Sequence, residues 1–85
     1  MPQVTVIVGS AEGLHARPAA IIVEAVQAAG FPVTIAVSGG VPVNAGSALM
    51  LMTLGAAKGT EVIVSCDDQP TLDKIAELVA NDLDA

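Results

Sequence analysis

This chain has almost no aromatic side chains and very few positive charges. Its 85 residues include one Phe, no Trp and no Tyr, and three Lys or Arg residues stand against nine Asp or Glu residues. The formal net charge is therefore −6. Nucleic-acid binding needs clustered basic side chains and commonly uses aromatic side chains on which bases stack. The composition argues against a nucleic-acid partner, and we expect the acidic surface to serve solubility.

Cysteine and long apolar runs are also scarce. The single cysteine, Cys66, rules out an internal disulfide and a cysteine-rich metal site. It follows a β-branched run, so we expect a small buried or half-buried thiol rather than a redox centre. No apolar run reaches the roughly 18–20 residues of a membrane span, and the first residues lack the features of a signal peptide. We therefore expect a cytoplasmic protein that does not insert into membranes.

The length of the chain suits one domain with a single core, residues 1–85. Its β-branched runs predict four strands, and apolar residues at i, i+3, i+4 and i+7 predict three helices. The expected strands are 4–8, 32–37, 41–44 and 61–66, and the expected helices are 17–29, 47–54 and 70–83. The order β-α-β-β-α-β-α indicates an α+β open-faced β-sandwich, in which three helices cover one face of a four-stranded antiparallel sheet.

Glycine and proline mark several boundaries of these elements. Gly30 is placed to end the first helix in a left-handed conformation, and residues 38–40 predict a glycine turn between the second and third strands. Pro42 cannot donate a ladder hydrogen bond, so the third strand should lie at an edge or be broken. The apolar stripes expected to face the core are Ala19, Ile22, Val23, Val26 and Ala29 in the first helix and Leu72, Ile75, Ala76, Val79 and Leu83 in the last.

The only histidine and the only arginine, His15 and Arg17, stand two residues apart where a loop turns into a helix. Pro18 suits a first helical turn, because its missing N–H costs nothing there. A helix start presents unpaired backbone N–H groups, here those of Ala16 and Arg17, and the positive end of the helix dipole. With a nucleophilic imidazole and a guanidinium beside it, such a site could accept, hold and pass on a phosphoryl group.

The stretch Gly-Leu-His-Ala-Arg-Pro-Ala resembles the active-site motif of the HPr family, the small histidine phosphocarriers of the bacterial phosphoenolpyruvate-dependent sugar phosphotransferase system. The resemblance covers the whole chain, because the family has the same order of elements. It implies that His15 takes a phosphoryl group on Nδ1 from phospho-Enzyme I and gives it to the IIA domain of a sugar permease. It also implies a monomeric carrier rather than an enzyme, with no metal and no cofactor, and assigns phosphate stabilisation to Arg17.

The second expected helix is apolar on almost every side. One interpretation is core packing with chance exposure, and the other is a docking surface, for which methionine is well suited. The resemblance favours docking to Enzyme I and IIA partners. The residues expected on its exposed side are Leu49, Met50 and Met52.

Ser47 is expected to cap this second helix. The resemblance also places it at the family's regulatory serine, which a dedicated kinase phosphorylates in many Gram-positive bacteria. Gly46 and Ala48 stand where the family usually has a lysine and a bulky apolar residue. These departures favour the capping role over regulatory phosphorylation.

Two further features set this chain apart within the resemblance. Lysines are nearly absent, so contact with Enzyme I would rest on Arg17, apolar side chains and Lys58. Glu12 stands just before the histidine, where its charge would slightly oppose a phosphate, and we assign it no catalytic role. Two alternative functions stay open: a paralogue in a nitrogen-related or dihydroxyacetone-kinase phosphorelay, and a non-catalytic ligand-binding regulatory domain of similar build.

Overall fold

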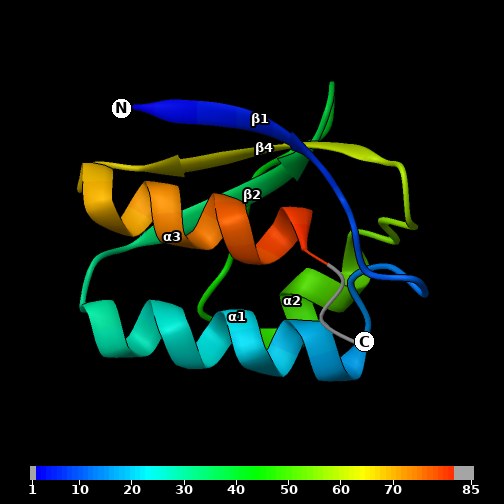
Figure 1. Cartoon of the computed structure of the whole chain (residues 1–85), viewed down its shortest axis with the longest axis horizontal. Coiled ribbons are helices and arrows are strands. Elements are labelled where there is room, and N and C mark those ends of the chain that lie inside the picture. Colours follow the sequence, from blue (N-terminus) through cyan, green and yellow to red (C-terminus); the bar gives the residue numbers. More distant parts are fainter. Residues whose placement is uncertain (1, 82–85) are drawn as a thin grey trace.

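The computed structural model describes residues 2–81. Its four strands, β1 (Gln3–Ile7), β2 (Val33–Val37), β3 (Val43–Asn44) and β4 (Glu61–Cys66), form one antiparallel sheet in the order β1-β4-β2-β3. The helices α1 (Ala16–Ala29), α2 (Ala48–Thr53) and α3 (Gln69–Ala80) lie on one face of that sheet (Figure 1). The α+β open-faced architecture expected from the sequence is confirmed.

The core lies between the sheet and the helices. On β4, Val62, Val64 and Cys66 alternate toward the helices and are fully buried, as the twofold side-chain period of a strand requires. Cys66 is thus a buried core thiol, as expected. The facing residues of α1 and α3 are those of the two predicted stripes, with Val23 and Ala29 only half-buried and Leu83 outside the described residues.

Most element boundaries fall within one residue of expectation, but the end of α3 does not. This helix stops at Ala80, and Asn81 has an extended backbone with φ −85° and ψ 155°. The expected continuation to residue 83 is therefore wrong at Asn81. The loop after β1 uses the carbonyl groups at this helix end, since the Gly9 N–H donates to Val79 at 3.0 Å and Ser10 Oγ to Asn81 at 3.3 Å.

The third strand is shorter than expected, and its place explains why. β3 pairs only Val43 with Ile35 and Asn44 with Thr34, at the edge of the sheet. Pro42 precedes it and cannot donate to a ladder, so the expected strand 41–44 is cut to two residues. The predicted turn is present, with Gly39 at φ 81°. Gly30 likewise ends α1 at φ 78°.

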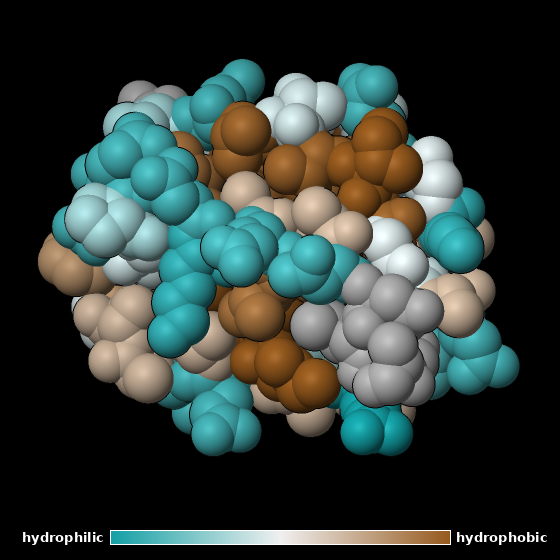
Figure 2. All heavy atoms as spheres, in the orientation of Figure 1, coloured by the Kyte–Doolittle hydropathy of each residue, from teal (hydrophilic) through white to brown (hydrophobic). Residues whose placement is uncertain are grey.

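The helical layer presents a mixed surface. Hydrophilic side chains gather over the exposed face of α3, and apolar ones show beside it (Figure 2). An open groove of about 290 Å³ runs between α1 and α3. Within residues 2–81, no helix is long and apolar enough to cross a membrane.

Candidate functional site

The loop between β1 and α1 is held against the segment that follows α2. The Leu14 N–H donates to the Ala56 carbonyl at 2.9 Å, and the Leu14 side chain is buried. Gly13 has φ 79°, and a Cβ there would overlap the Ala56 carbonyl oxygen and lie 2.8 Å from Ala57 Cα. Both the left-handed backbone and the close approach require glycine. The backbone before His15 is therefore fixed at a defined place.

His15 is the N-cap residue of α1, with an extended backbone at φ −104° and ψ −160°. Its carbonyl accepts the first helical hydrogen bond, from the Ala19 N–H at 2.9 Å. Pro18, the third helical residue, has no N–H. The helix start thus offers the N–H groups of Ala16 and Arg17, for which α1 supplies no acceptor. The structure brings these two donors and the imidazole together, at the end where the helix dipole favours an anion.

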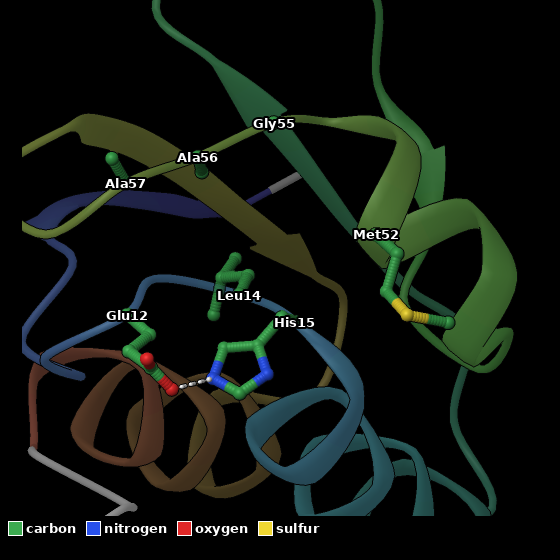
Figure 3. Close-up of a pocket in the computed structure, with 7 residues that line it drawn as sticks. All are labelled: Glu12, Leu14, His15, Met52, Gly55, Ala56 and Ala57. Carbon is green, nitrogen blue, oxygen red and sulfur yellow. Dashed lines mark ion pairs between the residues drawn. The ribbon is translucent and has the colours of Figure 1, made fainter.

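The two nitrogens of the His15 ring have different surroundings. Nε2 is shielded from solvent and lies 3.4 Å from Glu12 Oε2, although the side chain as a whole is 42% exposed. Figure 3 shows the Glu12 carboxylate pointing at this nitrogen, with Nδ1 on the far side of the ring. Nδ1 is bonded to Cγ and so stands nearer the backbone that opens α1. The nitrogen nearer the helix start is the one that Glu12 does not face.

An open pocket of about 250 Å³ lies beside the imidazole. Met52 of α2 contributes to its wall together with His15, so the histidine and α2 share one surface (Figure 3). The remaining lining residues are Glu12, Leu14, Gly55, Ala56 and Ala57. The segment 55–57 was not foreseen from the sequence, because its alanines carry no reactive group. The only sign of it was the small size of Gly13, which allows a backbone to approach.

Arg17 lies on the first turn of α1 and is exposed. It is not part of the pocket wall, and it forms no ion pair with another residue of the described range 2–81. The structure therefore places its backbone N–H at the helix start but leaves its guanidinium in solvent. A long side chain on this turn needs only rotamer changes to reach an anion beside His15.

The second helix is capped and apolar, as expected. Ser47 Oγ accepts the Met50 N–H at 3.3 Å, which confirms the capping role. Leu51 is buried, while Leu49 is 69%, Met50 40% and Met52 39% exposed. We call these three exposed residues the α2 patch. No charged residue occurs anywhere in residues 46–57.

Potential metal ligands do not gather in the part of the chain that the structure describes. No group of three or more His, Cys, Asp or Glu side chains there could hold an ion. Glu12 and His15 stand together without a third such partner within that range.

Comparisons with known proteins point to one family. The model for the PTS HPr component phosphorylation site matches residues 2–81. The phosphocarrier protein HPr of Streptomyces coelicolor is 48% identical over 87 aligned residues, covering 99% of this chain and 94% of that protein. The phosphocarrier protein HPr of Vibrio cholerae is 38% identical over 68 residues, covering 80% of this chain and 79% of that protein.

Solved structures agree with this relationship. The phosphocarrier protein HPr from Bacillus anthracis superposes with a TM-score of 0.84 at 28% identity, covering 92% of this chain and 95% of that one. HPr-C-His from Thermoanaerobacter tengcongensis gives a TM-score of 0.76 at 29% identity, covering 91% and 92%. The sequence and the fold are thus similar to those of the same group of proteins.

Proposed function

Because this chain belongs to the HPr family of phosphotransferase-system phosphocarriers, we propose that His15 accepts a phosphoryl group from phospho-Enzyme I and passes it to the IIA domain of a sugar permease. The observation that carries the proposal is the place of His15 as N-cap of α1, beside the Ala16 and Arg17 N–H groups. A nucleophile and two anion-binding donors meet at one half-exposed point of the surface.

The chemistry needs little machinery beyond this geometry. The Nδ1 lone pair of His15 attacks phosphorus while the bond between phosphorus and the donor nitrogen breaks. The N–H groups of Ala16 and Arg17 then donate hydrogen bonds to phosphoryl oxygens, and a charge-assisted hydrogen bond of this kind contributes about 1.5–3 kcal/mol. Transfer to the IIA domain runs the same exchange in reverse. The chain acts as a carrier, not an enzyme, because it is itself the phosphorylated species and needs no cofactor for this exchange.

Arg17 supports the phosphorylated state in this proposal. Its planar fork of donors can engage two phosphate oxygens at once. The guanidinium is exposed and has no ionic partner in residues 2–81, so no ion pair within that range has to break when it turns toward the phosphoryl group.

The α2 patch is the docking surface in this proposal. Leu49, Met50 and Met52 expose apolar area, and Met52 joins the pocket that His15 lines. A partner seated on the patch therefore also covers the histidine, which is what transfer between two proteins requires. We propose that the carrier works as a cytoplasmic monomer.

The test is the intact mass of the protein after incubation with phosphoenolpyruvate, magnesium and purified bacterial Enzyme I. We expect one added phosphoryl group that is lost in acid, as a phosphohistidine would be. Since His15 is the only histidine, this result would also locate the site. The matched control is His15→Ala, which should fold but gain no mass.

Absence of any gain would overturn the proposal, provided that the same Enzyme I charges another HPr. Charging by the Enzyme I of a nitrogen-related phosphorelay alone would move the carrier to that pathway. Acid-stable added mass would place the modification on another residue and remove His15 from the site.

A further inference from the structure

We propose that Glu12 is a positioning residue for phosphoryl transfer, whose carboxylate keeps the proton of the neutral His15 ring on Nε2, so that Nδ1 carries the lone pair that attacks phosphorus. The inference rests on the proposed function for its role in the reaction. Its structural part, the control of the ring proton, can be tested without any partner protein.

The contact itself has a clear direction. Glu12 Oε2 lies 3.4 Å from Nε2, the ring nitrogen that is shielded from solvent (Figure 3). An ionised carboxylate accepts hydrogen bonds and cannot donate them, so it favours the tautomer with N–H at Nε2. The distance is longer than that of a close hydrogen bond. Contacts of this kind commonly tighten when the reacting complex forms.

The backbone holds both residues in this relationship. Glu12 lies within the turn that the Gly13 N–H closes by donating to the Ser10 carbonyl at 2.9 Å. His15 comes directly after Leu14, whose backbone N–H is hydrogen-bonded to the Ala56 carbonyl, and it is the N-cap residue of α1. Because the backbone of both residues is held in place, only the side-chain torsions of Glu12 and His15 are free to change the contact.

The tautomer matters because of the proton balance of the transfer. With N–H at Nε2, the Nδ1 lone pair forms the new N–P bond while the donor nitrogen keeps the electron pair of the old one. No proton has to leave the ring. The product is a phosphorylated imidazolium that retains its Nε2 proton, and the Glu12 carboxylate faces the positive charge that develops there.

This geometry changes what the charge of Glu12 is expected to do. From the sequence, a carboxylate before the histidine would only oppose a phosphate. In the structure it faces Nε2, whereas the proposed function places the phosphoryl group on Nδ1, on the other side of the ring. The carboxylate is therefore within 3.4 Å of the ring nitrogen that becomes positively charged, where its attraction partly offsets its repulsion of the phosphoryl group.

The experiment combines ring ¹⁵N chemical shifts with single-turnover phosphorylation by Enzyme I. The spectrum holds one imidazole, because His15 is the only histidine. For the unmodified protein at alkaline pH, we expect a protonated Nε2 and an unprotonated Nδ1. In Glu12→Gln and Glu12→Ala, the two shifts should move toward each other. The transfer rate should fall about two- to fivefold, because the Glu12 side chain is 77% exposed and its attraction to the ring is partly screened by water.

Glu77→Gln is the matched control, since it removes the same charge from the exposed side of α3. It should change neither the ring shifts nor the rate. Unchanged ring shifts in both Glu12 variants would overturn the proposal, whether or not the rate falls. Moved shifts with an unchanged rate would overturn the role in transfer. If Enzyme I does not phosphorylate the unmodified protein, the proposed function fails, and the ring shifts still decide the contact.

Discussion

The backbone N–H of Leu14 donates a 2.9 Å hydrogen bond to the carbonyl of Ala56. This bond joins the loop before His15 to the segment after α2, two parts of the chain that are far apart in sequence. Gly13 makes the approach possible, since a side chain there would overlap the same carbonyl. The position of the histidine thus depends on a backbone contact and not only on the motif around it.

Replacing Gly13 by alanine should destabilise the fold by about 3 kcal/mol, from the left-handed backbone and the overlap together. Gly30→Ala is the matched control, because Gly30 has φ 78° but no atom within 4 Å of an added Cβ. Gly30→Ala should lower the free energy of unfolding only by the cost of a left-handed backbone at a residue with a side chain, about 1–2 kcal/mol. Urea unfolding measures both. Equal losses would show that the approach to Ala56 is not tight in solution.

Arg17→Ala should slow phosphoryl transfer by about 10- to 100-fold without abolishing it, since one charge-assisted interaction is lost. The transfer rate of Arg17→Lys should lie between those of the unmodified protein and Arg17→Ala, because an ammonium group keeps the charge but lacks the planar fork of donors. Rapid-quench phosphorylation by Enzyme I gives the rates. Thermal unfolding should be unchanged, as the side chain is exposed. Equal rates for all three proteins would remove Arg17 from the mechanism.

Ser47→Ala should destabilise the fold by about 1 kcal/mol through loss of the cap on α2. Ser47→Asp should keep the cap, because a carboxylate also accepts the Met50 N–H, but it would place a charge beside the α2 patch. We expect near-normal stability and weaker Enzyme I binding for this variant. Calorimetric titration together with thermal unfolding separates the two effects. Unaltered binding would argue against any regulation through Ser47.

Binding to Enzyme I should depend only weakly on salt, because residues 46–57 carry no charge and apolar contact is little affected by screening. Only Arg17 and Lys58 supply positive charge to the proposed contact. Leu49→Ala should weaken binding about tenfold, since Leu49 is the most exposed member of the α2 patch. Val41→Ala, an equally simple truncation at an 81% exposed residue outside the patch, should have no effect. A steep decline of affinity with salt would instead show that charges dominate the interface.

Local patterns were sufficient to predict most of the fold. The alternation of Val62, Val64 and Cys66 and the stripe of Ile22 and Val26 depend only on the period of a strand and of a helix. The end of α3 could not be predicted in this way. It is set where Gly9 and Ser10, about 70 residues earlier in the chain, use its last carbonyl groups. Such a contact leaves no mark on the periodicity of the helix.

The candidate site also has features that local sequence predicts and features that depend on the folded backbone. The place of His15 at a helix start followed from Pro18 and the apolar run behind it, and the exposure of Leu49 followed from an excess of apolar residues in a short helix. The contact between Glu12 and His15 was missed, because the direction of the carboxylate depends on the turn closed by Gly13. The contribution of Ala56 to the pocket wall was missed, because an alanine side chain carries no reactive or polar group that would indicate a site.

Pro18 has a last consequence for the proposed carrier. As the third helical residue it removes one of the amide donors that a helix start normally presents, so α1 offers two, those of Ala16 and Arg17. A phosphoryl group has three outer oxygens. The two N–H groups at the helix start can therefore hydrogen-bond to two of these oxygens. The third oxygen can accept a hydrogen bond from a mobile side chain or from the partner protein. Because the helix start binds the phosphoryl group with fewer hydrogen bonds, the group is transferred more readily to the partner.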